Sequence, residues 1–515
     1  SHLESLSNSS AFLPYQKEGA AKPEDVASVV VHFTPAPLLN EHCYREWVEK
    51  FSRNTTHIYI NENSRCLGSE SVHKIQFKLN HLYPDSFSLL SDSKLFSVEE
   101  QRQQTLSKRL KIDLEEVEKP FFNGSNGKDH NELGDETLLN KCQAYTCLTY
   151  HIRPHLKIDE SKKIKFNSND FIKECYDIEG FQSTYDNVRT KVKAIKESIQ
   201  KSTKERLYPN ILFLGTGSCI PNKMRNTSGI VLNINSTSTM LLDCGEGTFG
   251  QLVRYLGASA ADVFLRHLSL VYVSHLHADH HIGFIRILLG RKKAFQRAQI
   301  KQIPKLVLLA PRGIMHYLNS YSANFETISD QFTLISNKDW IEGQDSSSEV
   351  TEFGERCRHS LGIRELKTCF VHHCPNAFGV AITLLDGWKL VYSGDTMPCQ
   401  ALVSIGEDCD LLIHEATMED ELKEDAKIKR HSTTSEAIDI GLSMKAKHVI
   451  LTHFSQRYAK VPLLDQVPEN VGVAFDNMLI HLSDLPCLSE LYPAYVSIFS
   501  EDVDEMLKKR MKMKN

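Results

Sequence analysis

No stretch of the chain approaches the roughly 20 consecutive apolar residues that a membrane-spanning helix requires. The chain also lacks any Cys-x-x-Cys pair, and its 13 cysteines are scattered over 515 residues. We therefore expect free thiols in a reducing compartment rather than a disulfide framework. The net charge of −5 is too small to predict a polyanionic partner. These absences predict a soluble intracellular protein, and the length predicts more than one domain.

The first residues, Ser1-His-Leu-Glu, include neither a methionine nor a basic and apolar leader. We expect the chain to begin inside a longer protein, so that a targeting segment would lie upstream. Residues 29–33, 41–51 and 57–61 follow the order strand, helix, strand of an α/β unit. No compact group of ligands or nucleophiles occurs in this half, which we interpret as a scaffold or binding surface.

A charged, lysine-rich segment follows, in which Val188, Val192 and Ile195 have helical spacing. Apolar strands then begin near Pro209 and alternate with helical segments, which predicts an α/β layered sandwich. Asp243 closes one of these strands beside two glycines. A carboxylate in this place often accepts a hydrogen bond from a metal-binding histidine and orients it.

The strongest signal is the stretch Val271-Tyr-Val-Ser-His275-Leu-His277-Ala-Asp279-His280. An apolar strand delivers His275 and His277 to the same side, since side chains two residues apart share a face. Asp279 and His280 follow on the next turn. Imidazole and carboxylate ligands in this pattern predict a metal site, with zinc favoured and manganese or iron as alternatives.

Three further strand ends supply a ligand each: His373, Asp395 and His453. Seven ligands are too many for one tetrahedral ion and suit two ions that share a carboxylate. We infer a binuclear zinc site in which Asp395 bridges. Such a site favours the hydrolysis of phosphodiesters.

A proton donor for the leaving group is predicted from two further motifs, His414-Glu415-Ala-Thr417 and His431-Ser-Thr433. His431 is the candidate donor and Glu415 the carboxylate that orients it and raises its pKa. Thr433 and Glu436 fit a capping box, which would hold His431 just before a helix. Between His281 and Phe325 there are eight Lys and Arg residues and no acid, which favours a polyanion-binding surface or a solvated helix face.

Together these motifs resemble the metallo-β-lactamase superfamily and, within it, the long form of ribonuclease Z. The resemblance covers about residues 208–490. Its zinc motif is His275-Leu-His277-Ala-Asp279-His280, and Pro221-Asn-Lys223-Met-Arg225-Asn226 resembles the family's PxKxRN loop. The HEAT and HST loops follow in the family order. Glyoxalase II would share the zinc ligands but not these loops, and the short interval between Asp395 and His453 leaves no room for a β-CASP domain.

The resemblance implies an endonuclease that removes 3′ trailers from precursor tRNA by cleaving after the discriminator nucleotide. One zinc ion would be held by His275, His277 and His373, and the other by Asp279, His280 and His453, with Asp395 between them. His372 is adjacent to His373, and alignment on Cys374 favours His373. Asp279 would orient the attacking water, and His431 with Glu415 would protonate the departing 3′ oxygen. Lys223, Arg225, Asn226 and Thr433 would contact the substrate.

The implied fold is an α/β αββα sandwich preceded by a partial, degenerate copy of the same fold without metal ligands. Residues 29–33 parallel residues 411–415, and residues 57–64 parallel residues 448–455, with Glu62 in the place of His453. We expect the partial copy over residues 1–165, a charged helical linker over 166–207, the catalytic domain over 208–490 and a basic helical tail over 491–515. The arm that grips tRNA in this family would lie further upstream.

Other implications concern partners and location. The family acts on precursor tRNA without a membrane or a small-molecule cofactor, and its long forms are expected to be monomers in the mitochondrion or nucleus. Two alternative functions follow from the residues themselves. The protein could be a broader zinc phosphodiesterase acting on small esters, or a non-catalytic RNA-binding protein.

Overall fold

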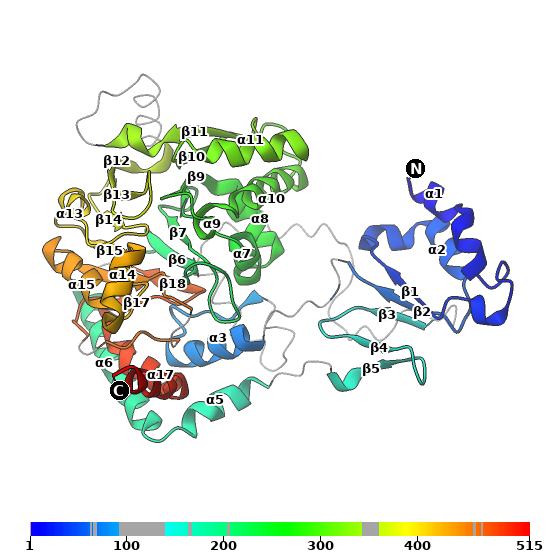
Figure 1. Cartoon of the computed structure of the whole chain (residues 1–515), viewed down its shortest axis with the longest axis horizontal. Coiled ribbons are helices and arrows are strands. Elements are labelled where there is room, and N and C mark those ends of the chain that lie inside the picture. Colours follow the sequence, from blue (N-terminus) through cyan, green and yellow to red (C-terminus); the bar gives the residue numbers. More distant parts are fainter. Residues whose placement is uncertain are drawn as a thin grey trace. The chain divides into compact units, whose positions relative to one another are not determined.

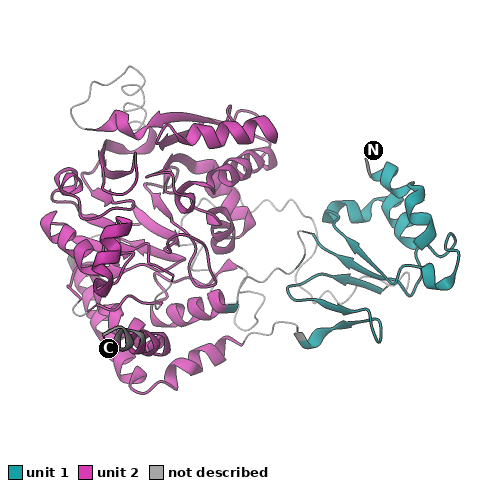
Figure 2. Cartoon of the chain, in the orientation of Figure 1, with its two compact units in different colours: residues 1–70, 120–166 teal, residues 71–119, 167–515 magenta. Residues whose placement is uncertain are grey.

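A computed structural model describes residues 2–61, 64, 70–91, 140–162, 167–202, 206–341, 360–456, 460–464 and 467–514. The chain divides into two compact units (Figure 2), the first formed by residues 1–70 and 120–166 and the second by residues 71–119 and 167–515. These limits differ from the boundaries expected above, because residues 71–91 pack in the second unit. No described helix is long and apolar enough to span a bilayer.

The first unit is built on a parallel sheet of order β1-β2-β3, with strands β1 (Val29–His32), β2 (Thr56–Tyr59) and β3 (Asn140–Gln143). Helix α2 (His42–Glu49) connects the first two strands and buries Tyr44, Trp47 and Val48, so the predicted strand, helix, strand order is confirmed. The unit also contains α1 (His2–Ser7) and the antiparallel pair β4 (Thr149–His151) and β5 (Lys157–Asp159).

The second unit contains two large sheets (Figure 1). The seven-stranded sheet has the order β11-β10-β9-β8-β7-β6-β18. Its strands are β6 (Asn210–Gly215), β7 (Gly229–Asn233), β8 (Thr239–Leu242), β9 (Leu268–Tyr272), β10 (Leu306–Ala310), β11 (Phe332–Ser336) and β18 (Met478–His481). The six-stranded sheet has the order β12-β13-β14-β15-β16-β17. Its strands are β12 (Ile363–Phe370), β13 (Phe378–Leu384), β14 (Lys389–Tyr392), β15 (Leu411–Glu415), β16 (His448–Thr452) and β17 (Val471–Val473).

Strand β6 explains how the layers form, because alternate side chains of Ile211-Leu-Phe-Leu214 enter different cores. Ile211 and Phe213 belong to the core shared with the six-stranded sheet. Leu212 and Leu214 belong to a second core with the helices that cover the other face. A strand buried on both faces is apolar throughout, as its sequence is.

Helices cover the outer faces of the two sheets, on opposite sides in Figure 1. The seven-stranded sheet is covered by α7 (Thr248–Leu256), α8 (Ala258–His267), α10 (Phe284–Arg297) and α11 (Ile314–Asn324). The six-stranded sheet is covered by α13 (Gln400–Gly406) and α15 (Thr434–Ser443), with α14 (Lys423–Lys429) nearby. This α/β/β/α arrangement confirms the predicted layered sandwich.

Helices from outside the sandwich pack on it as well. They are α3 (Glu70–Leu82), α5 (Ser168–Tyr176), α6 (Phe181–Ser202), α16 (Tyr492–Ile498) and α17 (Ser500–Lys514). Leu79 of α3 and Val188 of α6 are buried in the core that the two sheets share. The Tyr83 hydroxyl donates to Asp484 Oδ1 at 2.6 Å. The segment expected to be a connecting helix therefore contributes apolar side chains to the second unit.

Candidate metal centre

The seven predicted metal ligands lie at strand ends of both sheets. His275 and His277 follow β9 of the seven-stranded sheet, and Asp279 and His280 lie on the short helix α9 (Ala278–His281). The other three residues follow β12, β14 and β16 of the six-stranded sheet; they are His373, Asp395 and His453. Only His277 is exposed, since the other six are buried. The structure thus brings all seven residues into one cluster where strand ends of the two sheets meet, and the cluster is buried except at His277.

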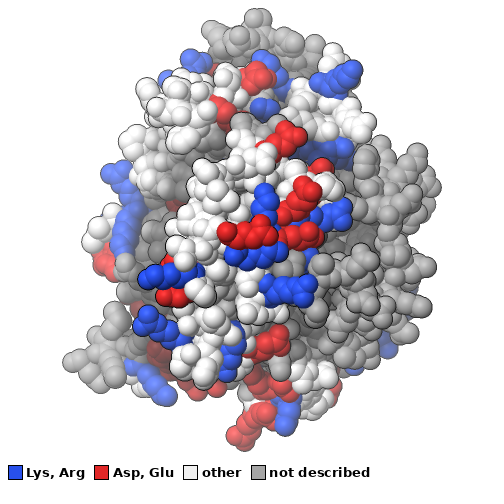
Figure 3. Space-filling model, turned by 90° about the vertical axis from the view of Figure 1, so that its right-hand side faces the viewer, with Lys and Arg blue, Asp and Glu red and all other residues white. Residues whose placement is uncertain are grey.

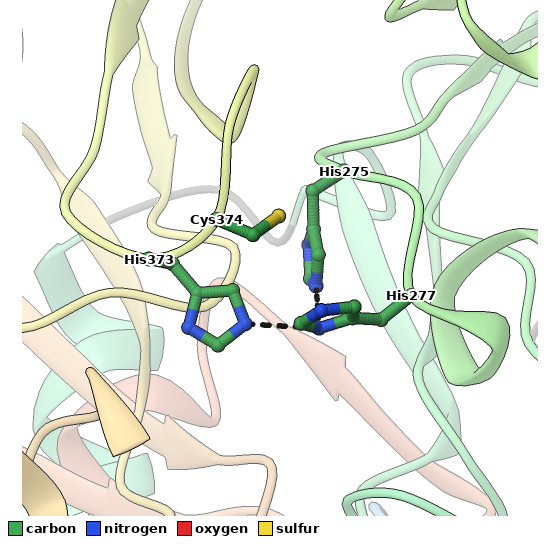
Figure 4. A group of neighbouring side chains, drawn as sticks. All are labelled: His275, His277, His373 and Cys374. Atoms are coloured by element: carbon green, nitrogen blue, oxygen red, sulfur yellow. Dashed lines mark hydrogen bonds between the residues drawn. The ribbon is translucent and has the colours of Figure 1, made fainter. Parts of the chain in front are cut away.

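The first group contains three imidazoles (Figure 4). The Nδ1 atom of His277 lies 3.0 Å from the Nε2 atom of His275 and 3.0 Å from the Nε2 atom of His373. Asp395 Oδ2 is 3.7 Å from the Nε2 atoms of His275 and His373. His373, and not the exposed His372, therefore joins the cluster.

The second group lies on the other side of Asp395. The Nε2 atoms of His280 and His453 are 3.2 Å apart. Asp279 Oδ2 is 3.6 Å from the Nε2 atom of His280 and 3.5 Å from the Nε2 atom of His453. Asp395 approaches both histidines at 3.3 Å, Oδ2 facing His280 and Oδ1 facing His453. The carboxylate of Asp395 therefore stands between the two groups, in the place predicted for a bridging ligand.

The donor set fits a divalent cation. His280 Nδ1 donates to Asp243 at 2.7 Å, and His373 Nδ1 donates to the carbonyl of Arg430 at 2.8 Å. A neutral imidazole carries one N–H, so in the neutral form that metal binding requires, the Nε2 atoms of these rings would present lone pairs to the cluster. Asp395 Oδ1 is buried and has no hydrogen-bond partner. Converging lone pairs around a buried carboxylate oxygen suit a metal ion, and imidazole with carboxylate suits zinc.

The charges and pKa shifts around the cluster also favour a bound cation. Burial, assisted by His280, holds the pKa of His275 well below its usual value, and burial also lowers the pKa values of His277 and His373. These rings are therefore neutral, which is the state that binds a metal. Burial also opposes charge on His280, but Asp395, Asp279 and Asp243 together raise its pKa well above the usual value. Three carboxylates around one ring create the negative potential that a cation would neutralise.

Asp243 anchors the cluster, and its predicted hydrogen bond to a histidine is confirmed. Besides His280, its Oδ2 accepts from the Ser274 hydroxyl at 2.8 Å and from the Tyr392 hydroxyl at 2.7 Å. Its Oδ1 accepts from the Ser274 backbone N–H at 2.7 Å. Tyr392 lies at the end of β14 and has no motif in the sequence that marks it as part of the site. The anchor therefore joins the two sheets beneath the metal ligands.

The predicted acid–base pair is also brought together. His431 Nδ1 lies 2.8 Å from Glu415 Oε1, and the Glu415 side chain is 1% exposed. Burial lowers the pKa of His431, but the Glu415 carboxylate outweighs this effect and raises it to about 9. His431 Nδ1 is 4.0 Å from Asp395 Oδ2, so the pair borders the metal ligands. The imidazolium form is therefore available at neutral pH.

Thr433 caps the helix that begins just after His431. Its hydroxyl accepts from the Glu436 N–H at 3.3 Å, and its own N–H donates to the Glu436 carboxylate at 3.1 Å, which confirms the predicted capping box at the start of α15. Thr417 was missed by the sequence argument. Its hydroxyl contacts the Glu415 carboxylate and lies 2.8 Å from His453 Nδ1, so it links a candidate acid–base residue to a candidate ligand.

The loop of residues 221–226 is divided between surface and interior. Lys223 is exposed, whereas Arg225 and Asn226 are buried. The Arg225 guanidinium lies over the rings of Phe454 and Phe475, at 4.7 and 5.1 Å from their centroids. It donates to the carbonyls of Ala474 and Lys460 at 3.1 and 2.6 Å. The buried guanidinium thus fixes the loop from within. Upstream, the Cys219 N–H donates to Asp279 at 2.7 Å.

Some of the basic side chains in the acid-free segment from His281 to Phe325 pair with acids from elsewhere. Arg297 forms a bidentate salt bridge with Asp262. The Nζ atom of Lys292 lies 3.6 Å from a carboxylate oxygen of Glu326. Arg291 is buried and donates to the carbonyl of Pro304. Arg312 lies 3.4 Å from Asp339, so three of the eight basic residues face an acid from outside the segment. On the different face of the molecule that Figure 3 draws, Lys and Arg side chains are interspersed with Asp and Glu.

Comparison with known proteins agrees with this geometry. Residues 209–467, about half of the chain, match the family model described as Anti-Pycsar protein Apyc1. The chain is 40% identical to ribonuclease Z, mitochondrial, of Drosophila melanogaster, over 96% of this chain and 62% of that protein. It is 38% identical to the zinc phosphodiesterase ELAC protein 2 of Homo sapiens, over 98% of this chain and 56% of that protein. The chain thus spans about six tenths of the length of these relatives.

Among solved structures, a long form RNase Z from yeast matches with a TM-score of 0.68 at 21% sequence identity. The match covers 94% of this chain and 68% of that chain. At this identity the likeness concerns the fold, and it extends over both units of the chain.

Proposed function

Because the chain belongs to the ribonuclease Z family, and over residues 209–467 to the family of the Apyc1 model, we propose that it is an endoribonuclease that removes 3′ trailers from precursor tRNA. The observation that carries this proposal is the His431–Glu415 pair at the edge of the His and Asp cluster. A metal centre alone would serve many hydrolases. A buried carboxylate and an imidazolium beside it suit the protonation of a leaving alkoxide.

The proposed metal content is two zinc ions per catalytic domain, with manganese or another divalent ion as a substitute. His275, His277 and His373 would hold one ion, and Asp279, His280 and His453 the other, with Asp395 shared. When bound, such ions supply a Lewis acid for the phosphate and favour deprotonation of water at neutral pH. The zinc named in the human relative supports this choice.

The protein's own residues then move protons. Asp279, fixed by the Cys219 N–H, orients the attacking water and accepts its proton. Water oxygen bonds to the phosphorus after the discriminator nucleotide, and the bond to the 3′ oxygen breaks. His431 donates its proton to that oxygen while Glu415 holds the ring. The tRNA retains a 3′ hydroxyl and the trailer carries a 5′ phosphate.

Substrate contact is proposed for the loop of residues 221–226, in two parts. Lys223 is exposed and would touch the RNA backbone, since a lysine neutralises a phosphate as a point charge. Arg225 and Asn226 are buried, so their proposed role is to hold the loop in position. Thr433 is 2% exposed and, through its capping box, would position His431 for the substrate.

The first unit is proposed to be a partial, degenerate copy of the catalytic fold. Its parallel order β1-β2-β3 matches the parallel order β15-β16-β17, and in both sets a helical segment joins the first two strands. Among its described residues no group of three or more His, Cys, Asp or Glu side chains is close enough to bind a metal. Glu62, the counterpart of His453, lies outside the described residues. The domain limits 1–165, 166–207, 208–490 and 491–515 remain part of this proposal.

We further propose that the protein is a monomer that acts on precursor tRNA in the mitochondrion, as the Drosophila relative's name suggests, or in the nucleus. The test of function is incubation with a tRNA that carries a 3′ trailer, followed by mapping of both product ends. The proposal expects a 3′ hydroxyl after the discriminator and a 5′ phosphate on the trailer. Equal turnover of bis(p-nitrophenyl) phosphate and precursor tRNA would instead favour a broad phosphodiesterase.

A further inference from the structure

Cys374 lies beside the metal ligands, and the mechanism above does not use it. Its sulfur belongs to a group with one ring nitrogen each of His275, His277 and His373, in which all four atoms lie within 4.8 Å of one another. Figure 4 shows the half-buried Cys374 side chain beside the three imidazoles, with its sulfur on the side of His275. Because Cys374 follows His373 directly, the strand end that delivers the histidine also delivers the thiol.

The distances are close to those of a closed zinc site. With Zn–N of about 2.0–2.1 Å and Zn–S of about 2.3 Å, neighbouring ligand atoms in a tetrahedron lie roughly 3.3–3.6 Å apart. The ring nitrogens of His275 and His373 lie 3.0 Å from that of His277, a few tenths of an ångström inside this spacing. The sulfur lies within 4.8 Å of the three nitrogens, so a shift of up to about 1 Å brings it to ligand distance, and a rotation of the single side-chain torsion of cysteine can provide it.

Asp395 competes for the same fourth position, at 3.7 Å from His275 and His373. It also faces His280 and His453 more closely, at 3.3 Å. When the second group holds no metal, we expect the closer contacts with His280 and His453 to keep the Asp395 carboxylate away from the first group. The sulfur, which lies within 4.8 Å of the three ring nitrogens, can then serve as the fourth donor to an ion bound by the first three histidines.

We propose that Cys374 is an alternative fourth ligand of the ion held by His275, His277 and His373. With one ion per chain, its sulfur closes a three-histidine, one-cysteine site and releases the thiol proton to solvent. A closed tetrahedral site has no open position for water, so this form is inactive. Binding of a second ion draws Asp395 into the bridge, and the sulfur leaves. The inference rests on the proposed metal site.

The test is a cobalt titration of the metal-free full chain. Bound Co²⁺ reports occupancy of the histidine site and bonding of the Cys374 sulfur by separate absorption bands. Visible d–d bands report ions in the histidine site, and near-ultraviolet charge-transfer absorption reports a cobalt–thiolate bond. We expect both signals at one equivalent of Co²⁺ and loss of most near-ultraviolet absorption at two. Cys374→Ser and Cys374→Ala should lose the near-ultraviolet band and keep the visible bands.

The matched control is Cys43→Ser. Cys43 lies on helix α2 of the first unit and belongs to none of the groups that could bind a metal, so this variant should keep both signals. Two results would overturn the proposed role of Cys374 and leave the metal site intact. One is a near-ultraviolet band of equal strength in Cys374→Ala, and the other is a lack of this band in the unaltered protein that still shows the visible bands. Absence of the visible bands from the unaltered protein would overturn the metal site and, with it, the proposed function.

Discussion

Replacement of Thr417 by valine tests whether the candidate acid–base pair and the candidate metal ligands act through one hydrogen-bond network. Valine has nearly the same shape as threonine and removes only the hydroxyl. That hydroxyl contacts Glu415 Oε2 and lies 2.8 Å from His453 Nδ1. Without it, His453 loses its partner at Nδ1, and Glu415 Oε2 keeps only the Thr417 N–H at 3.2 Å. The variant thus weakens two buried groups at once.

The expected magnitude follows from these losses. A buried polar group left without its partner costs about 1–3 kcal/mol. Removal of a group that orients a metal-binding histidine lowers metal affinity or activity roughly 10- to 100-fold, which corresponds to about 1.4–2.7 kcal/mol. The two estimates agree. Because Thr417 is only 4% exposed, we expect kcat to fall by this factor while KM for precursor tRNA changes little.

The assay combines single-turnover cleavage of a trailer-bearing tRNA with zinc content measured by mass spectrometry during chelator titration. Thr417→Ser is the matched control, since it keeps the hydroxyl and should remain within a few-fold of the unaltered protein. Unchanged kcat and zinc affinity in Thr417→Val would refute the network. An equal loss in both variants would assign the effect to the methyl group and packing instead.

Other predictions concern the proton donor, the loop and the metal. His431→Ala should lower cleavage about 10²- to 10⁴-fold while zinc stays near two per chain, and loss of zinc would identify His431 as a ligand. Arg225→Lys loses the planar contacts with Phe454 and Phe475, so we expect about 2–4 kcal/mol less stability in urea unfolding; an unchanged midpoint would contradict a positioning role. Burial raises the pKa of Asp476 to about 6 from 3.8. At this site the folded state therefore binds more protons than the unfolded state between these values, so the contribution of Asp476 to stability falls as pH rises through this window, by at most about 3 kcal/mol; Asp476→Asn should remove this contribution from the difference between the unfolding free energies at pH 4.5 and pH 7. Chelation of zinc should lower the unfolding temperature, and the result would count against the site if chelation left it unchanged.

The metal ligands could be predicted from the sequence because each is local to a strong pattern. An apolar strand ends, and a histidine or aspartate follows, as at Tyr392 and Asp395 or at Thr452 and His453. The capping box of Thr433 spans three residues, so it too is visible in the sequence. Local signals of this kind predicted the sandwich and the ligand positions.

The other parts depend on pairs that are distant in sequence. Tyr392 and Asp243 are 149 residues apart, and Arg225 and Lys460 are 235 apart. A tyrosine at a strand end predicts a core residue, and an arginine in a polar loop predicts a surface residue. The fold reverses the second expectation, because Phe454 and Phe475 supply aromatic faces over which the guanidinium is buried. The packing of residues 71–91 on the second unit had no local signal either.

The site exists only where the two sheets meet, so the bonds between the sheets are as much a part of it as the ligands. The seven-stranded sheet supplies the His-rich stretch, and the six-stranded sheet supplies His373, Asp395 and His453. Contacts of 3.0–3.2 Å between ring nitrogens would not survive a displacement of one sheet by an ångström. Three bonds prevent it: the Tyr272 hydroxyl donates to the Phe378 carbonyl at 2.7 Å, the Phe378 N–H donates to the Ser274 carbonyl at 3.0 Å, and Tyr392 donates to Asp243 at 2.7 Å. All three lie directly beneath the cluster, so the core fixes the sheets at the point where the chemistry requires it. A motif can therefore identify the ligands, but the distances between them are set by side chains that carry no metal-site signature of their own.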